Sequence, residues 1–181
     1  MIEESIIEKS RAGDRRALSE MVQTLTPVAW RIAFRILASN EAAEDVAQES
    51  LVKAWRSLGR LRKGESFAPW FYRIVVNCCY DEIRRMKRLN TIKTDEKTWI
   101  RLGELISGDS GGVPMVSEYE DIIRAVTSEL SPVQKTVFVL SDLEGMGYSQ
   151  IAEITGSNLN SVKSNLHYAR KRVIEIVKGR Y

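Results

Sequence analysis

This chain of 181 residues has few side chains that could carry out catalysis, and their spacing does not indicate a shared catalytic site. His167 is the only histidine, and the two cysteines, Cys78 and Cys79, are adjacent, which disfavours both a disulfide and a zinc site. The carboxylates between residues 41 and 49 lack the histidine partner that acid–base or metal-dependent hydrolysis needs. We therefore expect no catalytic residue, no metal and no cofactor. Both thiols should be buried and reduced, with a redox role as the less favoured alternative.

A binding chemistry is indicated instead by residues 148–172, where hydrogen-bonding and cationic side chains face away from an apolar stripe. The stripe recurs at three- and four-residue steps, the period of a helix packed on one side, and comprises Leu159, Val162, Leu166, Ala169, Val173 and Ile176. The opposite face carries Ser161, Ser164, Asn165, Tyr168, Lys171 and Arg172. Such side chains bind base edges and phosphates, so DNA contact is favoured over a helical hairpin with a merely solvated face.

The elements that would position this polar face are two short helices around a tight turn. Ser149 is the expected N-cap of the first helix, and Gly156 is expected to end it in the left-handed conformation. Asn158 can then cap the second helix, whose polar face would lie in a DNA major groove. The pattern is that of a helix-turn-helix.

Residues 56–88 form a second cationic region, with nine Lys or Arg residues against three Asp or Glu. An exposed basic loop is expected over residues 59–69, followed by a helix from Pro69 to about Arg88. Trp70 and Phe71 stand at the start of this helix, and a run of cations stands at its end. Aromatic rings beside cations can stack on unpaired bases. The alternative, a buried aromatic pair with a solvated helix end, is about equally supported by this region alone.

The charge distribution also predicts the domain organisation. Residues 89–121 carry three basic against seven acidic residues, whereas residues 148–178 carry five against two. The acidic part is interrupted by Gly108, Gly111, Gly112 and Pro114, which is typical of a linker. We predict an all-α protein with two small helical domains, residues 1–90 and 118–181, joined by a flexible acidic linker, residues 91–117. The second domain would be a four-helix unit that contains the helix-turn-helix.

The remaining helices follow from their caps and their apolar periods. One is expected over residues 2–10, and another from Asp14 to residue 38, with Pro27 either starting a new helix or kinking a continuing one. Residues 41–58 would bury a stripe that includes Trp55 and expose Asp45, Gln48 and Glu49 on another face, which is usually only solvated. Two further helices are expected over residues 119–130 and 131–143, with Ser131 as a cap and Val133 buried.

Taken in order, these segments resemble a known family. Residues 13–18, 45–55 and 70–77 look like region 2 of a bacterial sigma factor. Residues 130–134, 143–145 and 148–172 look like region 4. Because the extra domains of primary sigma factors are missing, the chain resembles the small extracytoplasmic function (ECF) group over about residues 10–175.

The resemblance implies a role for each of the three surfaces. Core RNA polymerase would dock on Asp45, Gln48 and Glu49. The melted −10 promoter element would bind Arg60, Arg62, Lys63, Trp70, Arg73, Asn77, Arg84 and Arg85. The duplex −35 element would bind Ser161, Lys163, Ser164, Asn165, His167, Tyr168, Arg170 and Lys171. An anti-sigma factor is a further implied partner.

We therefore expect a promoter-specificity factor that binds core RNA polymerase, recognises the −35 and −10 elements and helps to melt the −10 region. The alternative is a stand-alone helix-turn-helix regulator that binds duplex operator DNA, but it leaves the basic region 56–88 unexplained. A nuclease is disfavoured by the lack of a carboxylate–histidine group. With no signal peptide and no apolar run near 18 residues, the expected location is cytoplasmic.

Overall fold

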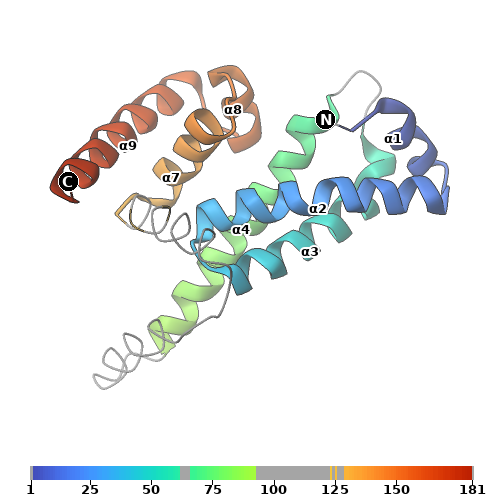
Figure 1. Cartoon of the computed structure of the whole chain (residues 1–181), viewed down its shortest axis with the longest axis horizontal. Coiled ribbons are helices and arrows are strands. Elements are labelled where there is room, and N and C mark those ends of the chain that lie inside the picture. The colour runs from blue at the N-terminus through green and yellow to red at the C-terminus, as the bar shows by residue number, and fades with distance from the viewer. Residues whose placement is uncertain (1, 62–65, 93–122, 124, 126–128, 181) are drawn as a thin grey trace.

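The computed structural model describes residues 2–61, 66–92, 123, 125 and 129–180, and every regular element in these ranges is helical (Figure 1). The N-terminal part contains α1 (Glu4–Arg11), α2 (Arg15–Leu37), α3 (Asn40–Ser57), the 3₁₀ turn η1 (Leu58–Arg60) and α4 (Phe67–Ile92). The C-terminal part contains α7 (Pro132–Phe138), the π-helical turn η2 (Val139–Leu143), α8 (Tyr148–Thr155) and α9 (Leu159–Arg180). The all-α prediction is confirmed. Most of residues 91–128 lies outside the described ranges, so the linker and the domain limits stay predictions.

Side-chain caps explain where helices begin. The carboxylate of Asp14 accepts hydrogen bonds from the backbone N–H groups of Arg16 and Ala17, at 2.8 and 3.2 Å. Ser131 and Gln134 form a reciprocal capping box at the start of α7, with bonds of 3.3 and 3.1 Å. Each cap satisfies amides that have no partner within the helix and contributes about 1 kcal/mol. The sequence prediction was correct at both positions.

Two predicted helix starts are each wrong by two residues. Gly147, not Ser149, is the N-cap of α8, and its N–H donates to the side-chain oxygen of Gln150 at 3.2 Å. The helix α4 begins at Phe67 and not at Pro69 as predicted. Pro69 therefore lies within the first turn of α4. Proline is tolerated there because the first four amides of a helix have no acceptor in the preceding turn.

The helix α2 runs unbroken through Pro27. Pro27 therefore lies within a continuing helix and does not start a new one. It ends at Ala38, whose φ of 56° is left-handed and whose N–H donates to the carbonyl of Phe34 at 2.7 Å. Glycine usually occupies such a position, because a Cβ is strained there. Ser39 then caps α3 by accepting from the N–H of Ala42 at 3.3 Å.

The N-terminal part is a bundle built around α2, which lies against α1, α3 and α4 (Figure 1). Its centre is filled by fully buried side chains that include Met21, Ile32, Phe34, Phe71 and Val75. Each contributes about 1.5–3 kcal/mol through the removal of apolar surface from water. This core fixes the faces that α3 and α4 turn outward.

Three residues that the sequence predicted to be buried are exposed. Trp55 is 54% exposed, Leu159 is 45% exposed and Val133 is 42% exposed. Leu159 and Val133 stand in the first turns of their helices. Ala54 and Leu58 occupy the buried side of this part of the chain, whereas Trp55 lies on the outer side of α3.

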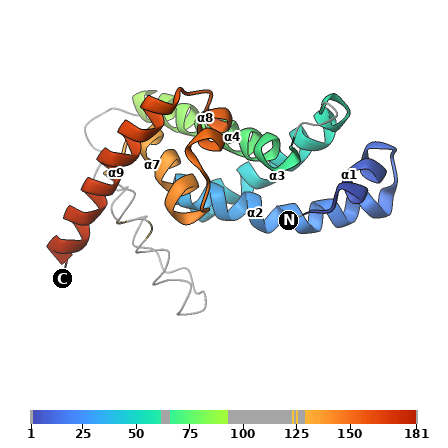
Figure 2. The ribbon, with the colours of Figure 1, turned by 90° about the horizontal axis from the view of Figure 1, so that it is seen from above.

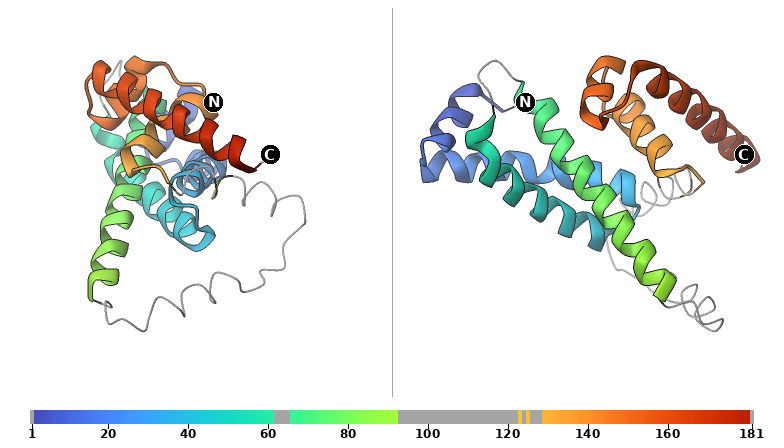
Figure 3. Two further views of the ribbon diagram at one scale, coloured as in Figure 1. Left: turned by 90° about the vertical axis from the view of Figure 1, so that its left-hand side faces the viewer. Right: turned by 180° about the vertical axis from the view of Figure 1, so that it is seen from behind.

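The C-terminal part packs against the N-terminal bundle, as Figures 2 and 3 show from three further sides. The helix α8 lies against α4, while α7 and η2 contact α2. The buried apolar residues of both parts form one connected cluster. In the ranges that are described, no helix is both long and apolar enough to cross a membrane.

Candidate functional site

The polar face of α9 is positioned by a tight turn after α8. Gly156 ends α8 with a φ of 65°, and its N–H donates to the carbonyl of Ala152. The side-chain oxygen of Asn158 then accepts from the N–H of Ser161 at 2.8 Å and caps α9. Both predicted turn residues, Gly156 and Asn158, have the expected roles, because each acts through contacts within a few residues of itself.

One side of α9 is anchored and the other is open. Val162, Leu166 and Ala169 are buried against the C-terminal core. Lys163, Ser164, His167, Tyr168 and Lys171 are all exposed. Ser161 and Asn165 are half-buried, and the amide of Asn165 donates to the Ser161 carbonyl at 2.8 Å. The side-chain amide of Asn165 is therefore held along the helix instead of pointing freely outward.

A hollow of about 420 Å³ lies beside the outward face of α9. Its lining is contributed by Tyr148, Lys163, Leu166, His167, Arg170, Lys171 and Ile174. Tyr148 comes from the first residue of α8, so both helices of the turn contribute to the hollow. Three cations around a concave surface suit an anionic group such as a backbone phosphate. The sequence analysis missed Tyr148 as a site residue, although its position as first residue of α8 could have indicated it.

Arg170 and Arg172 are occupied by carboxylates within the C-terminal part. Arg170 makes two bonds to Asp142 of η2, from Nε at 2.8 Å and Nη2 at 2.5 Å. This guanidinium lowers the pKa of the Asp142 carboxyl, and the carboxylate raises the pKa of Arg170 in turn. Arg172 bonds to Glu129, and to Glu175 at 2.8 Å. Arg170 thus braces α9 against η2 while also lining the hollow.

The α4 surface predicted to bind melted DNA is partly covered. Trp70 and Arg73 are half-buried, whereas Asn77 and Arg60 are exposed. The Arg73 guanidinium contacts the Glu153 carboxylate of α8 at 3.4 Å. Of the other predicted residues, Arg62 and Lys63 lie outside the described ranges.

The cations near the end of α4 pair with carboxylates of their own helix. Arg84 bonds to Asp81 and lowers the pKa of that carboxyl, helped by Lys53. Arg85 makes a two-pronged contact with Glu82, at 2.7 and 2.8 Å, which is the largest cause of its raised pKa. The charges of Asp45 and Glu41 raise the pKa of Arg85 further, so Arg85 lies on the side of α4 nearest α3. It is therefore separated from Arg73 and close to the acidic face.

The acidic face of α3 is exposed as the sequence predicted. Asp45, Gln48 and Glu49 all lie on the surface, and Glu49 pairs with Lys53 at 2.8 Å. The exposed apolar side chains Val52 and Trp55 continue the same face along the helix. The sequence analysis missed Trp55 here, although its spacing of three residues from Val52 and seven from Gln48 could have indicated it. The exposed Trp55 suits a protein-binding surface, because aromatic residues are enriched in protein interfaces.

The two cysteines are buried in the core of the bundle. Both Cys78 and Cys79 have no exposed surface, and burial is the largest cause of the raised pKa of Cys79. A buried, protonated thiol is a poor nucleophile. Within the described part, no group of three or more His, Cys, Asp or Glu side chains could hold a metal ion.

Comparison with known proteins shows the family to which the two parts of the chain are similar. Residues 21–89 match the family model "Sigma-70 region 2", and residues 120–173 match "Sigma-70, region 4". The chain is 30% identical to RNA polymerase sigma factor SigV of Bacillus subtilis, over 78% of this chain and 80% of that protein. It is 28% identical to the ECF RNA polymerase sigma-E factor of Haemophilus influenzae, over 96% of this chain and 94% of that protein.

Solved structures show the same fold at low sequence identity. The sigma factor RpoE of Bartonella quintana, in complex with the anti-sigma factor NepR, matches with a TM-score of 0.68 and 21% identity. That match covers 88% of this chain and 96% of the solved chain. CnrH in complex with the cytosolic domain of CnrY also matches with a TM-score of 0.68, at 20% identity over 97% of both chains.

Proposed function

The chain belongs to the sigma-70 family, in the ECF group, and directs RNA polymerase to promoters; on that premise we propose how its surfaces divide this task. The acidic face of α3 (Asp45, Gln48 and Glu49) binds core polymerase. The α4 surface and its preceding loop bind the melted −10 element. The outward face of α9 binds the duplex −35 element. The protein itself has no catalytic role and supplies recognition to the polymerase.

The observation that carries this proposal is the two-sided construction of α9. Its apolar side is buried at Val162, Leu166 and Ala169, so the helix has one fixed orientation on its domain. Its other side presents Lys163, His167 and other polar groups next to a cationic hollow. A helix fixed in this way can enter a major groove without losing its own core contacts.

The chemistry of α3 and α4 supports the other two assignments. A duplex-binding face must be cationic, but α3 presents carboxylates and an exposed Trp55, which suit a protein partner better than a polyanion. The α4 surface combines Trp70 with Arg73 and Asn77, and such a mixture suits unpaired bases and their phosphates. A stand-alone duplex-binding regulator would need neither surface.

We further propose a cytoplasmic location and control by an anti-sigma protein. The location follows from the polymerase that the protein must meet. The control is supported by the structural relatives, since the RpoE and CnrH structures are complexes with NepR and with the cytosolic domain of CnrY. Binding of the purified chain to a candidate anti-sigma domain, with loss of transcription, would test it.

The central test is transcription in vitro with purified core polymerase. The template is promoter DNA identified by mapping transcript start sites after overexpression of the protein. We expect promoter-dependent transcripts from the wild type. Asp45→Arg should abolish core binding, whereas Lys163→Ala should leave core binding intact and weaken initiation only at promoters with the −35 element.

Two control variants make the same changes in charge at positions on α1 and α2. Glu20→Arg and Lys9→Ala alter exposed residues that no proposed surface includes, and both should behave as wild type. Circular dichroism should show an unchanged helix content for all four variants. Normal core binding by Asp45→Arg would show that this face of α3 is not part of the polymerase interface. Absence of transcripts from the wild type would refute the assignment of the surfaces.

A further inference from the structure

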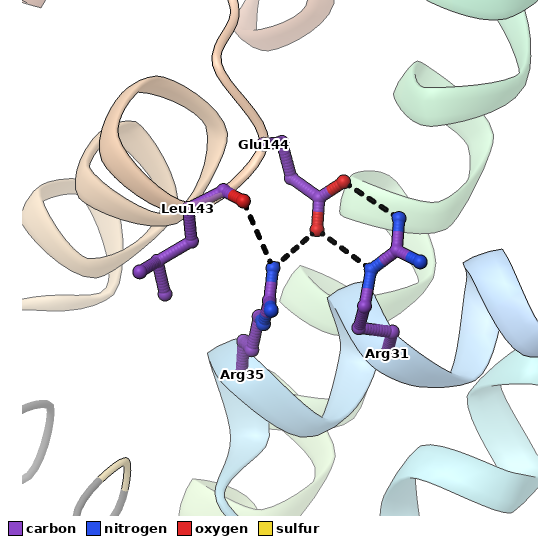
Figure 4. Close-up of polar contacts among 4 residues, drawn as sticks. All are labelled: Arg31, Arg35, Leu143 and Glu144. Atoms are coloured by element: carbon purple, nitrogen blue, oxygen red, sulfur yellow. Dashed lines mark hydrogen bonds and ion pairs between the residues drawn. The ribbon is translucent and has the colours of Figure 1, made fainter.

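Several arginine side chains link elements that are distant in the sequence. Arg31 and Arg35 of α2 both donate to the carboxylate of Glu144 (Figure 4). Arg11, the last residue of α1, differs from them because it donates to a backbone carbonyl. Its Nη2 atom lies 3.2 Å from the oxygen of Leu61, which is 50 positions away in the sequence. This contact therefore fixes the course of the main chain at Leu61 and does not neutralise a charge.

The position of Arg11 is itself fixed by the turn between α1 and α2. Gly13 has a φ of 89°, which a residue with a Cβ adopts only with strain. The N–H of Asp14 donates to the carbonyl of Lys9 at 3.0 Å, and the Asp14 carboxylate caps α2. The end of α1 is thus held against the start of α2. The Arg11 side chain consequently extends from a backbone that two helices hold in place.

Leu61 stands where the chain leaves η1 and enters the loop before α4 (residues 61–66). Leu61 is 6% exposed, and Leu58 is 2% exposed. The N–H of Leu61 donates to the carbonyl of Leu58 at 3.3 Å. The backbone of Leu61 is extended, with a φ of −62° and a ψ of 119°, so its own carbonyl needs a partner outside η1. Arg11 supplies that partner, and the first end of the loop is fixed by two buried side chains and one hydrogen bond.

The second end of the loop is fixed at the start of α4. Phe67 stacks on Phe71, with ring centroids 6.0 Å apart and an interplanar angle of 5°. Phe71 is fully buried in the core of the bundle. A short segment between two fixed ends has fewer conformations than a segment that is fixed at one end. Loss of the bond from Arg11 would loosen one of the two ends.

We propose that Arg11 is a positioning residue for the loop before α4, and that its bond to Leu61 makes this loop more selective for the bases of the −10 element. The part that concerns DNA rests on the proposed role of the loop in −10 recognition. A loop with fixed ends loses less conformational freedom when it binds, and it presents its side chains in a defined orientation. It also adapts less readily to a wrong base, so the bond favours correct over incorrect promoters. Arg11 itself contacts no DNA.

Limited proteolysis of the full-length chain tests the positioning role without any assumption about DNA. Trypsin cleaves after Arg60, Arg62 and Lys63, and mass spectrometry identifies the fragments. Because Arg11 is exposed, its substitution should not unfold the bundle. Arg11→Ala should be cleaved at these sites about two- to tenfold faster than the wild type, which is the effect of one lost hydrogen bond.

Two matched variants show whether the hydrogen bond or the charge is responsible. Arg11→Lys keeps a donor of similar reach and should be cleaved within about twofold of the wild-type rate. Lys9→Ala removes a cation from the same last turn of α1 without touching the loop, and it should also behave as wild type.

Promoter discrimination tests the part that concerns DNA. Transcription with core polymerase is measured on a promoter with its own −10 element and on a copy with one −10 base changed. Arg11→Ala should lower the ratio of the two rates about two- to tenfold and leave core binding unchanged, whereas Arg11→Lys should retain most of the discrimination. General damage to the bundle would weaken core binding as well. Direct contact of Arg11 with a phosphate would instead weaken both promoters equally and reduce the absolute salt slope by about 0.9.

Each part of the proposal has its own contrary outcome. An unchanged cleavage rate in Arg11→Ala would overturn the positioning role whatever the loop binds. Faster cleavage with unchanged discrimination would refute the link to −10 recognition. The double variant Arg60→Ala with Arg62→Ala tests the proposed role of the loop itself. If this double variant discriminates as well as the wild type, the loop does not recognise the −10 element, and the cleavage rates still decide the positioning role of Arg11.

Discussion

The cations of α9 differ in whether a carboxylate already holds them, and this difference predicts how each contributes to binding of the −35 duplex. Lys163 and Lys171 are exposed and form no ion pair within the described part of the chain. Arg172 bonds to both Glu129 and Glu175. A cation that neutralises a DNA phosphate releases counterions, whereas one that is already neutralised releases few.

The expected magnitude follows from the number of phosphates that each side chain can neutralise. Each phosphate contact contributes about 0.9 to the slope of log K against log salt concentration. Lys163→Ala should therefore reduce the absolute slope by about 0.9, and the double variant with Lys171→Ala by about 1.8. Arg172→Ala should reduce it by less than about 0.3, because its two carboxylate partners already balance the guanidinium charge.

Fluorescence anisotropy of a labelled −35 duplex, titrated with the polymerase-bound protein at several salt concentrations, measures these slopes. Lys9→Ala, on the exposed surface of α1, is the matched control and should leave the slope unchanged. A slope change for Arg172→Ala equal to that for Lys163→Ala would refute the reasoning. It would show that Arg172 exchanges its carboxylates for phosphate, and that the ion pairs do not determine which cations contact DNA.

Three further predictions concern stability. Leu166→Ala should lower the free energy of unfolding of the C-terminal part by about 2–5 kcal/mol in a urea titration, because this side chain is 2% exposed; a loss below about 1 kcal/mol would contradict its place in the core. Ala38→Gly should raise thermal stability by about 0.5–1 kcal/mol, because φ is 56° and glycine removes the Cβ strain; a lower melting temperature would contradict this. Arg170 lowers the pKa of Asp142 below its ordinary value of 3.8, so the pair stabilises the fold above that pH and loses its effect as the pH falls through the lowered pKa. The stability difference between wild type and Asp142→Asn should therefore be present at neutral pH and vanish in acid, and a pH-independent difference would contradict the ion-pair account.

Local features of the fold could be predicted because their causes lie within a few residues. Asp14, Ser131 and Asn158 cap their helices as expected, and Gly156 ends α8 with a positive φ. Each of these contacts depends on one side chain or one backbone conformation. Except at Leu159, the buried and exposed sides of α9 followed in the same way from the helical period.

Features that depend on distant residues could not be predicted. Arg31 and Glu144 are 113 positions apart, and neither has a neighbour in the sequence that indicates the other. The family resemblance assigned Arg170 to DNA binding, and only the fold reveals Asp142 beside it. Trp55 was predicted to be buried because the helical period identifies the apolar side of a helix. The period does not tell how much of that side the neighbouring helices cover.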